Sequence, residues 1–481
     1  MDSAESSPTR LTRNASLLFA ARVTSALTTL AVLSLVSRLR GPDDLGLVAL
    51  GFAAGGILAV LSDLGLGLLL VREASRDQAR TNTLLGTILA ARLVTIPLLL
   101  GGTWLILVAV FGASASIVWL SASGLVVQQL AELTRSLSLA RGRFGVMAAH
   151  SIIENVLWLA VIAVVLAAGL PLGLALLGGL LAFAGSVLAG LGIARFVLGA
   201  RPRMPTRPEA ARLAGDARPF SVFTVLNVLY SRLDTLLVGL LVPSSALVAA
   251  GAYYAATRMV AAFEYLPEAL SRSLFPDLSR GFAVDPSRLE SLLRRPAQFL
   301  LFIGIPVPFG VVVFGPWLMG ILFGPRISSF SWILVGLAAL VPLRFLSSLF
   351  GVTLTSADAQ GRRVVGAALA LVAVALTDVV LIPRLGVAGA LLGAAAATVI
   401  LLVIYTANVR PVLGTGLPLA HDAAVALLAS AGALGAGMVV RSVASDPLAT
   451  VAFGVAYVAL LIAISRPRLS SWPLRGRRGP A

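Results

Sequence analysis

The chain has 481 residues, of which 58% are hydrophobic and 12% are charged, and its formal net charge is +16. This composition excludes an ordinary soluble domain and indicates a polytopic membrane protein. The absence of cysteine excludes disulfides and thiolate metal sites, and the two histidines, His150 and His421, lie too far apart in the sequence to indicate a histidine metal cluster. All 37 basic residues are arginine, and most of them lie in short loops and in the tail. That placement is typical of membrane orientation, so no nucleic-acid partner is expected.

Apolar stretches of about 20 residues, the length that crosses a bilayer, recur along the whole chain. In the first part, helices are predicted at residues 15–36, 47–71, 84–111, 117–139 and 146–168, with a sixth ending near 198. Two more are predicted within 219–276, followed by helices at 297–323, 330–354, 364–382, 387–409, 419–440 and 448–464. The polar stretch 276–296 predicts a short interfacial helix, with Ser287 and Glu290 forming a capping box.

The pattern therefore predicts an all-α membrane protein of about fourteen transmembrane helices, arranged as two pseudo-symmetric six-helix lobes with two further helices. The expected boundaries are a cytoplasmic tail 1–14, an N-lobe 15–198, a cytoplasmic Arg- and Pro-rich linker 199–218, a C-lobe 219–409, two helices in 410–465 and a basic cytoplasmic tail 466–481.

The distribution of arginine supports this topology. With the N-terminus inside, the cytoplasmic segments hold 24 arginines and the external loops hold five. Positive residues concentrate on the cytoplasmic side of membrane proteins, so both termini are expected in the cytoplasm. A missed or an additional helix would invert every later loop and remove the asymmetry.

The two predicted lobes also show internal similarity. Gly142-Arg143, before the fifth predicted helix, matches Gly361-Arg362, before the eleventh, at an offset of 219 residues and in the same orientation. A parallel duplication of six helices is typical of transporters whose two lobes rock against each other.

Charged residues interrupt the two helices predicted within 219–276. Arg232 and Asp234 lie near the middle of the first of these helices, and Arg258, Glu264 and Glu268 lie in the second. An ionised side chain at the centre of a membrane helix costs about 2.5–3.5 kcal/mol on insertion scales. These side chains are therefore expected to face protein or water, as the wall of a polar cavity.

Several short motifs carry a resemblance to a known family. They are the stretches 38–46 (RLRGPDDLG), 63–67 (DLGLG), 71–76 (VREASR), 251–253 (GAY) with Arg258, and 357–362 (ADAQGR), together with Asp234. Over about residues 10–410 the chain resembles the Wzx-type polysaccharide flippases of the multidrug/oligosaccharidyl-lipid/polysaccharide exporter superfamily. The resemblance implies two six-helix lobes in a V, alternating access, and transfer of an undecaprenyl-diphosphate-linked saccharide to the outer leaflet.

Three arginines are the candidate substrate-binding residues. Arg22, Arg232 and Arg258 lie on the first, seventh and eighth predicted helices. Guanidinium groups bind diphosphate oxygens in a bidentate geometry, which suits the substrate that the resemblance implies. Asp234 is expected either to neutralise one of these arginines or to couple transport to protons or Na⁺, and ion coupling or charge pairing is likewise left open for Glu264 and Glu268.

Two further polar groups have alternative interpretations. Asp63 and Arg92 lie at a similar depth in neighbouring antiparallel helices, so a structural ion pair is favoured over a substrate contact. Gln128, Glu132 and Arg135 form a stripe along one face of a helix. The stripe either lines the cavity or is explained by a simple pair between Glu132 and Arg135.

The predicted function is to flip a polyprenyl-diphosphate-linked oligosaccharide from the inner to the outer leaflet of a bacterial cytoplasmic membrane. A drug or cation antiporter of the same superfamily is the alternative. A membrane glycosyltransferase or polysaccharide polymerase is disfavoured, because the chain has no nucleotide-binding loop, no G-x-S-x-G motif and no metal-spaced histidines. Neither an enzymatic activity nor a cofactor or metal is expected. The expected partners are the lipid-linked saccharide and the bilayer, with polysaccharide-assembly proteins as further candidates.

Overall fold

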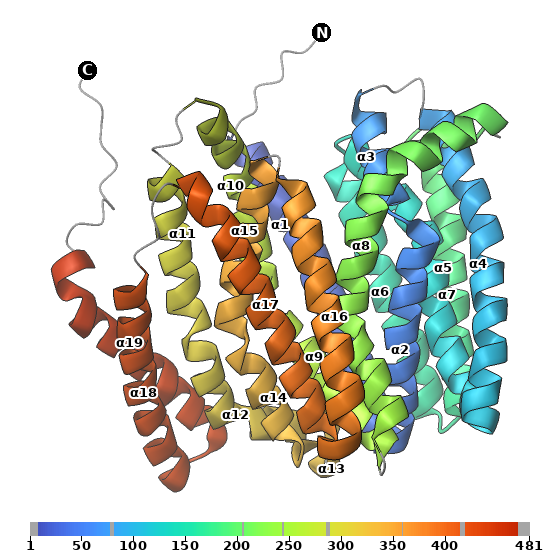
Figure 1. Ribbon diagram of the computed structural model, residues 1–481. Coiled ribbons are helices and arrows are strands. Elements are labelled where there is room, and N and C mark those ends of the chain that lie inside the picture. Colours follow the sequence, from blue (N-terminus) through green and yellow to red (C-terminus); the bar gives the residue numbers. More distant parts are fainter. Residues whose placement is uncertain are drawn as a thin grey trace. The chain divides into compact units, whose positions relative to one another are not determined.

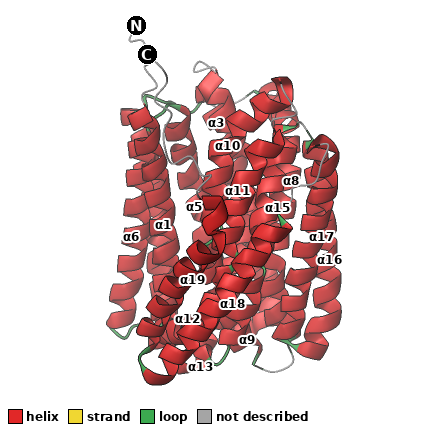
Figure 2. Cartoon of the chain, turned by 90° about the vertical axis from the view of Figure 1, so that its left-hand side faces the viewer, coloured by secondary structure: helices red, strands yellow, loops and turns green. Residues whose placement is uncertain are grey.

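The computed structural model describes residues 8–76, 81–203, 206–242, 245–284, 289–357, 359–413 and 419–469. Every regular element in these ranges is a helix, and no strand occurs among them, as Figure 2 shows. The all-α prediction is therefore confirmed for the part of the chain that is described.

The first half of the chain forms long helices joined by short turns. They are α1 (Pro8–Leu39), α2 (Pro42–Asp63), α3 (Leu66–Arg76), α4 (Thr81–Phe111), a short turn η2 (Gly112–Ser114), α5 (Ala115–Ala140), α6 (Phe144–Ala167), α7 (Leu172–Gly192), a π-helical turn η3 (Ile193–Val197) and α8 (Arg207–Leu241).

The second half contains more interruptions within its apolar stretches. Its helices are α9 (Ala246–Ala261), α10 (Tyr265–Val284), α11 (Leu289–Gly304), α12 (Pro306–Phe323), α13 (Pro325–Ser328), α14 (Ser331–Ala339), α15 (Val341–Ser356), α16 (Gln360–Leu385), α17 (Val387–Leu413), α18 (Ala420–Val443) and α19 (Asp446–Leu469).

Thirteen helical stretches in the described residues are long and apolar enough to cross a membrane. One of them, Thr81–Ala140, has 60 residues and includes both α4 and α5. At about 1.5 Å per residue it would span about three bilayer cores. The chain instead turns at Gly112, whose φ of 52° favours glycine, and α4 and α5 pack side by side. Counting α4 and α5 separately gives fourteen crossings, in agreement with the sequence prediction.

The chain divides into two compact units. Unit 1 comprises Met1–Arg258 and Leu371–Gly393, and unit 2 comprises Met259–Ala370 and Ala394–Ala481. The lobe boundaries 15–198 and 219–409 stay a prediction.

In unit 1, α2 packs against both α5 and α8, and these helices lie side by side in Figure 1. Glycines on α2 allow this close approach. A Cβ atom at Gly51 would meet Ser121 and one at Gly55 would meet the backbone of Ala122. Small residues permit the backbones of membrane helices to approach closely, so α2 is held by packing along much of its length.

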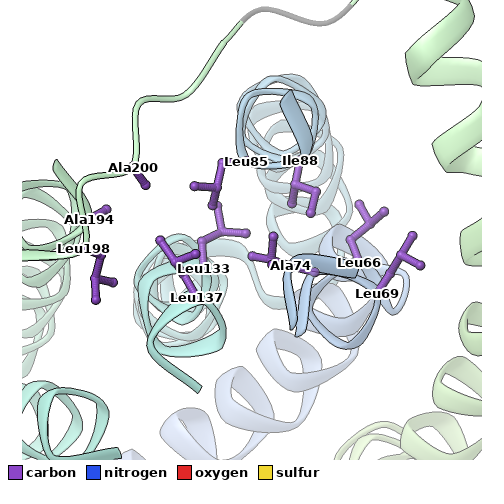
Figure 3. Close-up of a cluster of buried hydrophobic side chains, with 11 residues drawn as sticks. Leu66, Leu69, Ala74, Leu85, Ile88, Leu133, Leu137, Ala194, Leu198 and Ala200 are labelled. Atoms are coloured by element: carbon purple, nitrogen blue, oxygen red, sulfur yellow. The ribbon is translucent and has the colours of Figure 1, made fainter. Parts of the chain in front are cut away.

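The prediction that the second helix runs through residues 47–71 is wrong. The helix ends at Asp63, because Leu64 and Gly65 adopt left-handed conformations with φ values of 46° and 75°. A separate amphipathic helix, α3, follows and extends to Arg76. Its apolar side chains pack against α4 and α5 and against the segment that follows α7, as shown in Figure 3. This buried cluster explains why the chain turns back to the protein at α3.

The extent of the expected linker 199–218 stays a prediction. Helix α8 begins at Arg207, so part of the arginine-rich stretch is helical. The segment before it is attached to the start of α4, where the backbone N–H groups of Arg201 and Arg203 donate to the side chain and the carbonyl of Asn82 at 2.8 and 2.9 Å. Arg201 and Arg203 are therefore held against α4.

The polar stretch 276–296 contains no separate short helix in its described part, because α10 continues to Val284 and α11 begins at Leu289. Ser287 lies outside the described residues. Glu290 lies in the first turn of α11.

In unit 2, the last two helices pack onto the rest of the unit. Phe453 on α19 lies against Gly310 and Gly437, and the hydroxyl of Tyr457 donates to the carbonyl of Phe302 on α11 at 2.5 Å. Gln298 on α11 donates to Asp422 on α18 at 2.8 Å. The two helices are therefore an integral part of unit 2.

Candidate functional site

Two arginines of unit 1 lie on either side of one tyrosine. Arg232 is on α8, and Tyr254 and Arg258 lie one helical turn apart on α9. Nη1 of Arg232 lies 3.5 Å from the hydroxyl of Tyr254, and Cζ of Arg258 lies 4.8 Å from the centre of its ring. The structure thus brings together two of the three arginines that the sequence selects.

The guanidinium of Arg232 is also held by α2. Its Nη1 donates to the carbonyl of Phe52 at 3.1 Å. The group lies directly against Gly56, where any Cβ atom would overlap it. Only glycine at this position leaves room for the guanidinium between α2 and α8.

Neither Arg232 nor Arg258 forms an ion pair with a carboxylate in the described chain. Arg258 lies close enough to Arg232 for the two like charges to repel each other. The Nε atom of Arg258 is buried and has no hydrogen-bond partner among the described residues. Two like charges in an apolar interior without a counterion form a site that an anion would stabilise.

An aromatic row continues from the tyrosine across unit 1. Phe52 lies 6.2 Å from Tyr254 and 6.0 Å from Trp158 on α6, and Trp158 stacks on Phe183 of α7 at 5.4 Å between ring centres. Aromatic pairs at these spacings add about 0.5–1.5 kcal/mol beyond the burial of their surface. The row therefore connects the arginine pair rigidly to the packed helices behind it.

The third candidate arginine, Arg22, lies on α1 with an exposed side chain. Its expected participation in the same site stays a prediction.

A pair of acidic residues forms a second group in unit 1. Asp378 on α16 is completely buried, and neither of its carboxylate oxygens has a hydrogen-bond partner in the described residues. It lies within electrostatic range of Asp234 on α8, which accepts a hydrogen bond from the hydroxyl of Tyr253 at 2.7 Å. One oxygen of Asp378 lies so close to Gly393 that a Cβ atom there would overlap it. Asp234 and Asp378 thus lie close enough for their charges to interact.

Asp63 and Arg92 are in contact. Nη2 of Arg92 donates to the carboxylate of Asp63, and Nη1 donates to the carbonyl of Gln129 on α5. Arg92 is completely buried. The backbone N–H of Gly67 donates to the same carboxylate at 3.1 Å, so Asp63 also binds the first turn of α3. The pair therefore joins α2, α3, α4 and α5.

The polar stripe on α5 takes part in a buried network with α6. Arg135 is bound by two carboxylates, with its Nε 2.6 Å from Glu132 and its Nη1 2.6 Å from Glu154 on α6. Gln128 donates to the same Glu154 at 2.8 Å. The stripe makes contacts within the protein, although the side chain of Glu132 remains 42% exposed.

Helix α7 completes this network. The hydroxyl of Ser186 donates to the second oxygen of Glu154 at 2.5 Å, and Nε2 of His150 lies 3.0 Å from that hydroxyl. Both Glu154 and His150 are buried. Sequence spacing within one helix could not have identified Ser186 as their partner, since it lies on another helix.

In unit 2, Glu264 lies in the turn between α9 and α10, and its carboxylate is 3.0 Å from Nη1 of Arg344 on α15. Glu268 lies in the first turn of α10, and its expected role stays a prediction. The second helix predicted within 219–276 is thus not continuous.

Tyr254, Gly56 and Asp378 are the site residues that sequence reasoning missed or left without a role. A tyrosine four residues before an arginine on a helix is a weak signal for the contact between Tyr254 and Arg258. Nothing in the sequence indicates that Gly56 faces Arg232 or that Asp378 faces Asp234, because each pair comes from distant parts of the chain.

Comparison with known proteins gives a family match. The model of the family described as "Polysaccharide biosynthesis protein" matches residues 35–331. Two curated proteins of Haloferax volcanii are similar in sequence. The one named "Probable low-salt glycan biosynthesis flippase Agl15" is 24% identical over 395 residues, which is 79% of each chain. The one named "Probable flippase AglR" is 30% identical over 190 residues, which is 39% of each chain.

Solved structures of transporters share the fold. The structure described as "Lipid II flippase MurJ, inward closed conformation" matches with a TM-score of 0.73 and 14% identity, over 93% of this chain and 98% of that chain. An inward-facing multidrug resistance transporter of the MATE family and MOP superfamily matches with a TM-score of 0.64 and 15% identity, over 81% and 95% of the two chains. At these identities the likeness shows the fold alone.

Proposed function

The chain belongs to the polysaccharide biosynthesis protein family, and on that basis we propose that it flips a polyprenyl-diphosphate-linked oligosaccharide across the membrane by alternating access. The match agrees with the resemblance to Wzx-type flippases of the exporter superfamily. The curated relatives are themselves named flippases, and one is named for glycan biosynthesis.

The observation that carries this proposal is the pair of cations, Arg232 and Arg258, on one tyrosine. In the described chain no carboxylate neutralises either guanidinium, and both residues belong to helical stretches long and apolar enough to cross a membrane. A diphosphate supplies the missing negative charge and accepts bidentate hydrogen bonds from guanidinium groups. The saccharide needs a polar path, while the lipid tail remains in the hydrocarbon.

The acidic pair of Asp234 and Asp378 supplies a means of coupling transport to an ion gradient. Two ionised carboxylates in a buried site repel each other, so Asp234 and Asp378 together are expected to hold a proton or a monovalent cation. Release of that ion on one side of the membrane would then bias the transporter between its two conformations.

The alternative function, a drug or cation antiporter, shares this fold but requires a different site. A cationic drug would be repelled by two arginines without counterions. The arginine site therefore favours an anionic substrate. The curated relatives are named flippases, which also favours a transporter over an enzyme.

The proposed location is a bacterial cytoplasmic membrane with both termini in the cytoplasm. The arginine asymmetry supports this orientation. Polysaccharide-assembly proteins would supply the lipid-linked saccharide and receive it.

The test is a flipping assay with purified protein in liposomes that contain a fluorescent polyprenyl-diphosphate saccharide. Arg232→Gln and Arg258→Gln should each fold normally and lower the flipping rate at least about tenfold, a loss of about 1.4 kcal/mol. Replacement by lysine should restore only part of the rate, because lysine keeps the charge but loses the planar fork. Arg326→Gln, at an exposed position, is the matched control. Full flipping by both glutamine variants would overturn the proposal.

Coupling is tested in the same liposomes. Asp378→Asn keeps the shape of the side chain but removes the negative charge, so transport should lose its dependence on an imposed proton or sodium gradient. Asp422→Asn, another buried aspartate, is the control. Unchanged gradient dependence in the Asp378 variant would exclude the acidic pair as the coupling site.

A further inference from the structure

Tyr254 contacts both cations of the candidate site with different parts of its side chain. Its hydroxyl lies 3.5 Å from Nη1 of Arg232, and its ring faces Cζ of Arg258 at 4.8 Å. The tyrosine is almost completely buried, so it is a fixed part of the protein rather than a mobile surface group.

The surroundings restrict each of the three side chains. The ring of Phe52 packs against Tyr254 at 6.2 Å, and the carbonyl of Phe52 binds Arg232 at 3.1 Å. Gly56, one turn further along α2, lies directly against the same guanidinium. Because Arg232 and Arg258 repel each other, their separation depends on a group that attracts both, and Tyr254 is that group.

We propose that Tyr254 is the positioning residue that holds Arg232 and Arg258 as one site for a diphosphate, and that it thereby sets a preference for a diphosphate over a monophosphate. This inference rests on the proposed function. A diphosphate has two anionic groups at a fixed separation and gains from two cations held at a fixed separation. A monophosphate has one such group, so the second cation adds less to its binding affinity.

The two halves of the tyrosine can be separated by substitution. Tyr254→Phe removes the hydroxyl that faces Arg232 and keeps the ring beneath Arg258. Tyr254→Leu removes both interactions. The preference for diphosphate should fall about threefold in the first variant and about tenfold in the second. These factors correspond to the usual strengths of a hydrogen bond and of a cation–π interaction.

The experiment measures binding to the purified full-length protein in detergent, with undecaprenyl diphosphate and undecaprenyl monophosphate as the two lipid probes. Inorganic pyrophosphate and inorganic phosphate, used in parallel, distinguish recognition of the phosphates alone from recognition of the lipid. The readout is the ratio of the two dissociation constants. If Tyr254 had a purely structural role, its substitution would weaken the binding of both probes equally and leave the ratio of dissociation constants unchanged.

Tyr457→Phe is the matched control, because the hydroxyl of that buried tyrosine in unit 2 donates to the carbonyl of Phe302. Its ratio should equal that of the parent protein. Since Tyr254→Phe loses a single oxygen atom, it decides the question even if Tyr254→Leu does not fold.

The same assay distinguishes this inference from the proposed function. If Arg232→Gln and Arg258→Gln lose diphosphate binding but both Tyr254 variants keep the parent ratio, the positioning role is wrong and the cationic site stands. If the arginine variants bind both probes as the parent does, the cationic site itself is wrong.

Discussion

Arg232 on α8 lies directly against Gly56 on α2, where a side chain of any size would overlap its guanidinium. The contact gives α2 a part in the candidate site, together with Phe52, whose carbonyl binds Arg232 and whose ring packs against Tyr254. It also ties the position of a charged group to the packing of two helices.

The first prediction is that Gly56→Ala lowers flipping about tenfold without loss of folded protein. The added methyl group should push the guanidinium of Arg232 away from Phe52 and Tyr254, at a cost of about 1–3 kcal/mol. Flipping in liposomes and the thermal stability of the purified protein are the measurements. Gly101→Ala is the matched control, since a Cβ atom there would meet nothing within 4 Å. Equal flipping rates for the two alanine variants would contradict the prediction.

The second prediction concerns Asp63 and Arg92. Asp63→Ala or Arg92→Ala should each lower the yield of folded protein, because each leaves an unpaired charge in the interior, at a cost of about 3–5 kcal/mol. Changing both residues to apolar ones should restore much of the yield. The measurement is the monodisperse fraction after purification. Single variants that fold well but do not transport would instead indicate a direct role in transport.

The third prediction concerns the two carboxylates that bind Arg135. Glu154→Gln should be more destabilising than Glu132→Gln, because Glu154 is buried and also binds Gln128 and Ser186, whereas Glu132 is partly exposed. We expect a loss of several kcal/mol for the first variant and about 1 kcal/mol for the second. Thermal unfolding in detergent measures the difference. The prediction fails if the Glu132 variant proves equally or more destabilised.

The fourth prediction concerns topology. The chain has no native cysteine, so single cysteines can be labelled without background. Ala113→Cys and Ser329→Cys should react with an impermeant reagent added to intact cells, because they lie in turns predicted to be external. Gln360→Cys should react only after permeabilisation. Labelling of Gln360→Cys in intact cells would rule out the predicted orientation.

The site was only partly accessible to sequence reasoning. The depth of residues in neighbouring helices predicted that Asp63 meets Arg92, since consecutive membrane helices pack beside each other. Arg232 and Arg258 could be selected because a charged side chain within an apolar membrane helix is costly and therefore indicates a function. Their shared partner, Tyr254, could not be selected with the same force, since a tyrosine in a membrane helix has many ordinary roles.

The sequence by itself determined that this chain crosses the membrane about fourteen times, because hydropathy and arginine placement are local properties that the bilayer selects directly. It also contained the family resemblance. Where α2 ends was decided by left-handed backbone at Leu64 and Gly65 and by the apolar face of α3, which must be buried. Only the tertiary structure decided that Asp378 lies near Asp234 and that Arg232 lies on Gly56. These contacts join helices far apart in the chain, and the packing of whole helices, rather than any spacing along one of them, sets which side chains meet.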